Sequence, residues 1–177
     1  YLFKKMAHVY DVDLTRGLLA RLCRAVKKQT YLSLQLKNGR LVVESGFFFL
    51  FKKELCPWSG VWPLQAGELL QPGWRVLVSE VRAVPETITP CWQKLWQGSV
   101  TFYLPAGCYC WQAAAPGASF GGARLYKWWA QQRVPRSFRT LVPVVFQDNA
   151  VFFDFLTGRK KNKAENSTFY YKIDVFI

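Results

Sequence analysis

The chain has 177 residues, which is enough for one or two domains with a buried core. Hydrophobic residues make up 51% of it and aromatic residues 17%, which excludes a disordered tail. Its 24 basic and 11 acidic residues leave a net charge of +13, which favours a polyanion as the partner; the alternative is a charge that only keeps the protein soluble.

No apolar run approaches the length of a membrane-spanning helix, so we expect no membrane partner. Because the sequence begins with Tyr1 and not with methionine, we expect it to be part of a longer protein. An odd number of irregularly spaced cysteines favours buried free thiols in a reducing, cytoplasmic compartment over a disulfide framework. These cysteines are Cys23, Cys56, Cys91, Cys108 and Cys110.

The first half of the chain predicts one helix followed by antiparallel strands. Leucines at helical spacing predict a helix over residues 14–29 with Asp13 as its cap. The other face of this helix is basic, and both a solvated face and an RNA contact remain open for it. Asn38-Gly39 lies between two alternating segments and predicts a hairpin, with a third strand at 47–51.

The middle of the chain predicts a domain boundary. Residues 56–73 are rich in Pro, Trp and Gly and predict an irregular packed loop, which a strand follows at 74–84. Residues 85–90 predict a linker. We place the boundary near residue 95, which gives domains of residues 1–95 and 96–177.

The second half predicts antiparallel strands around one short helix. The expected strands are residues 99–104, 108–111, 141–146, 151–156 and 168–177. In the helix, Trp128 and Trp129 are predicted to anchor in the core, and Pro135 ends the helical segment. The fold class is therefore α+β. It combines an N-terminal helix-plus-hairpin domain with a C-terminal mixed domain, in which antiparallel strands surround a short basic helix.

The stretch from residue 121 to 146 resembles the C-terminal domain of the tRNA(Ile)-lysidine synthases. The family pattern is roughly Gly-Gly-x-Lys-Leu-Lys, then Val-Pro-Pro-Trp-Leu-Arg-Asp, then Pro-Leu-Leu. Matching positions are Gly121, Gly122, Arg124, Leu125, Lys127, Val134, Pro135, Phe138, Arg139, Pro143, Val144 and Val145. Departures are Tyr126, Arg136 and Thr140, and the Gly-Asp-Arg that often precedes the glycines is absent from residues 114–119.

The resemblance implies a role in a larger enzyme. In this family an N-terminal ATP-pyrophosphatase domain uses ATP, with magnesium, and lysine to convert the wobble cytidine in the CAU anticodon of tRNA(Ile) to lysidine. The Ser-Gly-Gly-x-Asp-Ser loop of that domain is absent from this sequence. The chain would then be the middle domain (1–95) and the C-terminal tRNA-binding domain (96–177), without a catalytic site or a cofactor of its own. Its partners would be tRNA(Ile) and its own catalytic domain, and a homodimer remains open.

Residue patterns alone also indicate binding and not catalysis. The single histidine, His8, has no triad partners, and Cys108 and Cys110 lack a second pair for zinc. Arginine can grip phosphate through two parallel hydrogen bonds, and proteins recognise duplex RNA by its shape and phosphates. The tRNA-binding candidates are Arg124, Lys127, Arg133, Arg136, Arg139, Arg159, Lys160, Lys161 and Lys163.

Two alternatives remain open at this point. Single-stranded RNA could stack on an aromatic-faced sheet that includes Phe169 and Tyr170. The chain could also be a protein–protein interaction domain on which the cations are solvated surface charges. A preference for duplex over single strand, and the salt dependence of binding, separate these alternatives from a tRNA-binding domain.

Overall fold

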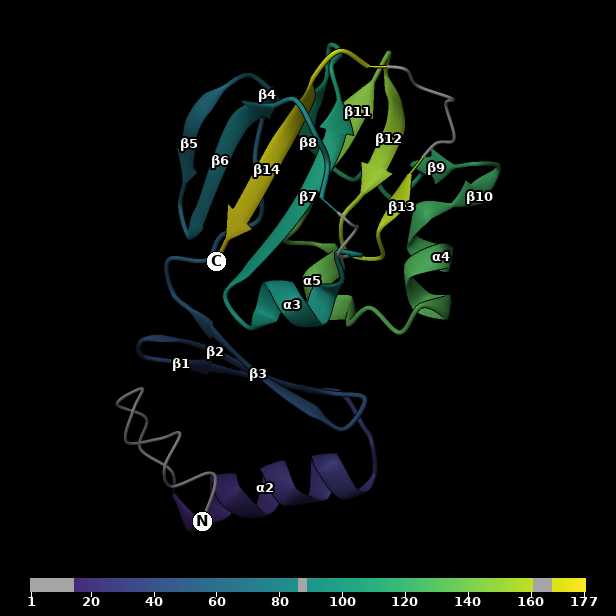
Figure 1. Ribbon diagram of the computed structural model, residues 1–177. Coiled ribbons are helices and arrows are strands. Elements are labelled where there is room, and N and C mark those ends of the chain that lie inside the picture. Colours follow the sequence, from purple (N-terminus) through teal and green to yellow (C-terminus); the bar gives the residue numbers. More distant parts are fainter. Residues whose placement is uncertain (1–14, 86–88, 161–166) are drawn as a thin grey trace. The chain divides into compact units, whose positions relative to one another are not determined.

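The computed structural model describes residues 15–85, 89–160 and 167–177 (Figure 1). It has few helices and many antiparallel strands, so the α+β class predicted from the sequence is confirmed. Two compact units make up the chain, Tyr1–Leu55 and Cys56–Ile177.

The two units divide at a different place from the boundary expected near residue 95. Strands from residues 67–81 lie in the same sheet as strands from residues 99–105 and 170–176, so the middle of the chain packs with its C-terminal part. The assignment of domains to those of the synthase family stays a prediction.

The described part of the first unit starts with a helix that has one apolar face and one charged face. Helix α2 (Arg16–Lys27) buries Leu22 and Ala25. Thr15 caps its first turn, because the Thr15 hydroxyl accepts a hydrogen bond of 3.2 Å from the backbone N–H of Leu18. The predicted cap, Asp13, lies outside the described residues.

Three antiparallel strands follow this helix, in the order β1-β2-β3. Their bounds are β1 Leu32–Leu36, β2 Gly39–Glu44 and β3 Phe47–Lys52. The predicted hairpin turn is confirmed, since Leu36 pairs with Gly39. Leu41 and Val43 of β2 share one apolar core with the buried face of α2. A small sheet gains stability from such a cover, which explains why helix and hairpin occur together.

The second unit contains two larger antiparallel sheets (Figure 1). One has the strand order β13-β12-β11-β8-β4, and the other has the order β5-β6-β14-β7. The strands are β4 Val61–Pro63, β5 Gly67–Gln71, β6 Trp74–Val81, β7 Ser99–Pro105, β8 Cys110–Ala113, β11 Pro143–Gln147, β12 Ala150–Asp154, β13 Arg159–Lys160 and β14 Tyr170–Phe176. Helix α3 (Trp92–Trp96) precedes β7.

Phe102 of β7 connects the two sheets. Its ring centroid lies 4.7 Å from that of Phe153 and 5.6 Å from that of Phe155. It also meets the indole of Trp111 on β8 at 6.1 Å. All four rings are buried. Because each aromatic ring buries a large apolar area, this cluster is a major source of the unit's stability.

The irregular loop expected over residues 56–73 is wrong, because this segment contains β4 and β5. Both strands lie at the edge of a sheet. An edge strand has one side without ladder hydrogen bonds, so Pro63 fits into β4 and Gly67 into β5. The same Pro and Gly content that predicts a loop is therefore compatible with an edge strand.

The cysteines are unpaired, as expected, but the expectation that they are buried is wrong. Cys23, Cys56 and Cys108 are exposed, and Cys91 and Cys110 are half-buried. Cys56 and Cys108 lie in connections between strands, where no core forms around them. Among the described residues, no helix is long and apolar enough to cross a membrane.

Two glycines of the first unit predict opposite effects of the same substitution. A Cβ at Gly39 would overlap the carbonyl oxygen of Phe51 on β3, so we expect Gly39→Ala to lower the free energy of unfolding by about 1 to 3 kcal/mol. At Gly17, in the first turn of α2, a Cβ meets nothing within 4 Å, so Gly17→Ala should raise it by about 0.5 kcal/mol. Urea denaturation followed by circular dichroism measures both. Equal changes in the free energy of unfolding for the two substitutions would contradict this prediction.

Candidate nucleic-acid interface

A glycine turn precedes the basic segment. Strands β9 (Ser119–Phe120) and β10 (Ala123–Arg124) pair antiparallel around Gly121 and Gly122. Both glycines have positive φ values, 56° and 80°, which is the geometry of a two-residue hairpin turn. A Cβ at Gly121 would lie 3.0 Å from a guanidinium nitrogen of Arg159, so the glycine also makes room for that side chain. The glycines therefore make a turn shortly before the helix that begins at Leu125.

Helix α4 (Leu125–Gln131) follows the turn and carries the predicted tryptophans. Trp129 and Leu125 are fully buried, which confirms Trp129 as a core anchor, whereas Trp128 is half-buried. Arg124 and Lys127 lie on the exposed side of the same segment. The helix therefore presents its cations to solvent while its indoles fix it to the sheets.

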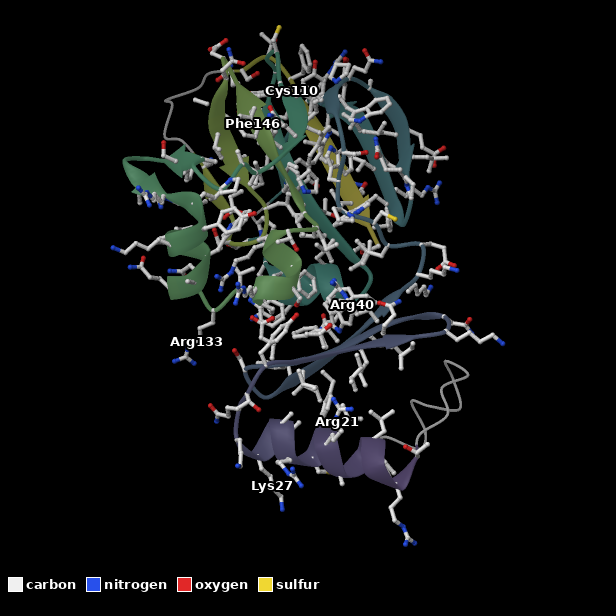
Figure 2. All side chains as sticks on the ribbon, turned by 180° about the vertical axis from the view of Figure 1, so that it is seen from behind. Arg21, Lys27, Arg40, Cys110, Arg133 and Phe146 are labelled. Carbon is white, nitrogen blue, oxygen red and sulfur yellow. The ribbon has the colours of Figure 1, made fainter. Side chains whose placement is uncertain are left out.

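Arg133 occupies a special position at the end of α4. The backbone N–H of Val134 donates to the carbonyl of Trp129 at 2.9 Å, and the N–H of Arg133 donates to that of Ala130 at 3.1 Å. This pair of bonds places Arg133 where helices usually have glycine, and its φ is 55°. Figure 2 shows its side chain extending away from the sheets. A large side chain in the left-handed region is unfavourable for the backbone, and Gln29 takes the same position at the end of α2.

The predicted binding residues differ in how they are placed. Helix α5 (Arg136–Arg139) follows buried Pro135 and carries two of them. The exposed candidates are Arg124, Lys127, Arg133, Arg136 and Lys160, whereas Arg139 and Arg159 are half-buried. Lys161 and Lys163 lie outside the described residues.

Arg139 supports the connection between the two helices. Its Nε and Nη2 atoms donate to the carbonyl oxygen of Val134 at 2.9 and 2.6 Å. Its own carbonyl accepts a hydrogen bond of 3.1 Å from the Tyr126 hydroxyl. Burial raises the pKa of the Tyr126 phenol, and the positive charge of Arg139 acts in the opposite direction. The guanidinium thus holds the loop that presents Arg133 and Arg136.

Arg159 packs between two aromatic rings. Its guanidinium carbon lies 4.3 Å from the ring centroid of Trp128 and 4.9 Å from that of Phe120. The position joins β13 to the β9–β10 hairpin and to α4. A cation between two rings gains from both, so Arg159 stabilises this corner of the unit.

The buried carboxylate of Asp154 holds α4 in place through hydrogen bonds. It is fully buried and accepts hydrogen bonds from Trp129 Nε1 at 2.8 Å, Thr157 Oγ1 at 2.6 Å and the Leu156 N–H at 3.0 Å. The Thr157 hydroxyl also accepts a bond of 3.0 Å from Trp128 Nε1. Both indoles of α4 are therefore held by one polar network.

Burial raises the pKa of the Asp154 carboxyl above its ordinary value of 3.8. The hydrogen bonds from Thr157, Trp129 and the Leu156 N–H, together with the charge of Arg159, act against this rise. Sequence reasoning missed Asp154. The available signal was a single acidic residue within the apolar run from 151 to 156.

The segment around these helices contains no acidic residue. From residue 87 to residue 147 the sequence has neither Asp nor Glu. The stretch that carries Arg124, Lys127 and Arg133 therefore contains no carboxylate of its own. No group of His, Cys, Asp and Glu in the described ranges could hold a metal ion, and His8 lies outside those ranges. The arrangement suits the binding of an anionic partner.

A basic segment fixed to a mixed α+β scaffold defines a candidate polyanion-binding module. No family model matches the chain. Over 169 residues, which cover 93% of the chain, it is 25% identical to the tRNA(Ile)-lysidine synthase of Protochlamydia amoebophila (strain UWE25). The chain spans 37% of the length of this curated relative. The resemblance to the tRNA(Ile)-lysidine synthases is thereby confirmed, and it extends well beyond residues 121–146.

The pH dependence of stability tests the Asp154 network. Between pH 3.8 and the raised pKa, the folded state binds more protons than the unfolded state, so the free energy of unfolding falls as the pH rises. Asp154→Asn removes this titration. We expect the stability of the wild type minus that of the variant to fall with rising pH in this window and then to level off. Urea denaturation at a series of pH values measures it, and a difference that rises with pH would contradict the assignment.

The packing of Arg159 gives a second test. Arg159→Lys keeps the charge but loses the flat guanidinium between Phe120 and Trp128, so we expect the free energy of unfolding to fall by about 1 kcal/mol. Lys160→Gln, at the exposed neighbour, serves as the control and should change stability little. If Arg159→Lys is as stable as the wild type, the two ring contacts contribute nothing to the free energy of unfolding.

Proposed function

We propose that this chain is the C-terminal, tRNA-recognition part of a tRNA(Ile)-lysidine synthase. In this proposal it grips the body and acceptor stem of tRNA(Ile), while the CAU anticodon enters a separate catalytic domain of the same protein. That domain, and not this chain, binds ATP and magnesium and carries out the ligation of lysine. A cytoplasmic location follows from this role, and a homodimer is compatible with it.

The observation that carries the proposal is the similarity to tRNA(Ile)-lysidine synthase over 93% of the chain. The acid-free segment from residue 87 to 147 supports it, because a surface with one sign of charge suits a polyanion. Arg133 gives further support. It is exposed in the turn after α4, where a partner can reach its guanidinium group.

The geometry suggests how such a surface would grip RNA. We call Arg124, Lys127, Arg133 and Arg136 the α4–α5 cations. They belong to one short segment whose backbone is fixed by Trp129, Asp154 and Arg139, so little order has to be gained on binding. Duplex RNA exposes phosphates and 2′-hydroxyls, and arginine can bind a phosphate with two hydrogen bonds. The contacts would then recognise the shape of the stem and leave its sequence unread.

Removal of three of these charges tests the proposal. The variant Arg124→Gln, Lys127→Gln and Arg133→Gly should bind tRNA(Ile) with a CAU anticodon more weakly. It should also lower the slope of log K against log salt by about 2 to 3, because each lost phosphate contact removes about 0.9. The variant should be at least as stable as the wild type, since glycine suits position 133. Fluorescence anisotropy titrations at several salt concentrations measure affinity and slope together.

A matched control removes three exposed lysines from the other unit, with Lys37→Gln, Lys52→Gln and Lys53→Gln. It lowers the net charge equally, so a larger loss in the first variant locates the contacts. An acceptor-stem duplex should compete well and a single strand poorly. Equal losses of affinity in both variants would show that the α4–α5 cations do not form the binding site. A preference for the single strand would favour stacking of bases on aromatic residues instead.

A further inference from the structure

Helix α2 carries a second set of cations, in the other compact unit. We call this set the α2 basic face; its members, all exposed, are Arg16, Arg21, Arg24, Lys27 and Lys28. Steps of three or four residues bring Arg21, Arg24 and Lys27 onto one side of the helix. Figure 2 shows Lys27 pointing away from the strands. The helix itself contains no acidic residue.

Helix stability does not explain this charge pattern. Arg21 and Arg24, and Arg24 and Lys27, are like charges three residues apart, which repel each other. Arg16 lies in the first turn, where the helix dipole disfavours a cation, although Arg24 and Lys27 suit the last turn. Two ion pairs of the described residues join Arg75 to Glu68 and Lys172 to Asp174, and neither involves a residue of α2.

The surroundings of α2 indicate which anionic partner fits. An amphipathic helix binds a membrane by inserting its apolar face, but Leu22 and Ala25 are already buried against Leu41 and Val43 of β2. The helix also has no aromatic side chain on which single-stranded bases could stack. What remains is a row of cations on a helix about 18 Å long, which suits the phosphates of a duplex.

We infer that the α2 basic face is a second RNA-binding surface, which contacts the phosphate backbone of duplex RNA without reading its sequence. It lies on a different compact unit from the α4–α5 cations, so the chain holds RNA at two places. The inference rests on the proposed function for the identity of the RNA, which would be the same tRNA.

The test uses the whole chain with Arg21→Gln, Arg24→Gln and Lys27→Gln. Glutamine has a helix propensity close to that of arginine and lysine, so α2 is retained, and circular dichroism verifies this. Titrations with tRNA(Ile) and with an acceptor-stem duplex should show an affinity loss of about tenfold to a hundredfold at moderate salt, and a salt slope lower by about 2 to 3. The lysine control at positions 37, 52 and 53 removes the same charge from the same unit and should lose much less.

Comparison with the α4–α5 variant separates this inference from the proposed function. If both triple variants lose more affinity than the control, both surfaces bind RNA. If only the α4–α5 variant does so, the α2 basic face is a solvated helix face and the inference is overturned while the proposed function stands. If only the α2 variant loses more affinity than the control, the inference stands and the α4–α5 cations do not belong to the binding site. Absence of RNA binding by the wild type at low salt overturns both.

Discussion

The hydrogen bond between Trp129 and Asp154 is the contact on which the basic segment depends. A carboxylate that is fully removed from water is unfavourable unless hydrogen bonds replace its hydration. Asp154 has three such bonds, and one of its donors, Thr157, also binds the indole of Trp128. Helix α4 has only seven residues, too few to be stable alone, so its position comes from these contacts and not from its own backbone. The orientation of Arg124 and Lys127 follows from them.

The arginines of this region have two different roles. Arg139 binds a backbone carbonyl and Arg159 lies between two rings, so their guanidinium groups act within the fold. Arg124 and Arg133 face solvent. A flat, delocalised cation can stack and donate at once, which lysine cannot do. Net charge therefore overstates the number of cations that are available to a partner, and the exposed ones need to be identified one by one.

Local patterns predicted local structure well. The Asn38-Gly39 hairpin, the short helix at Trp128 and Trp129 and the strands on either side of residues 147–150 all follow from neighbouring residues, and all occur. Contacts between distant residues were not predictable in this way. Asp154 meets Trp129 across 25 positions, and Arg159 meets Phe120 across a longer interval. The same limit applies to the boundary expected near residue 95, which differs from the observed division between the units. It does so because β6 pairs with β14, which is distant in the sequence.

The position of β14 has a consequence for how the protein folds. This strand, residues 170–176, lies between β6 and β7 and supplies the hydrogen-bonding partner of each. Until it emerges from the ribosome, β6 and β7 have no common neighbour, and each exposes an unpaired edge. Pairings between residues about a hundred positions apart close slowly, because a long loop must be ordered first. The second unit therefore completes this sheet only after residues 170–176 have been synthesised. During that interval its strand edges are open to pairing with other nascent chains.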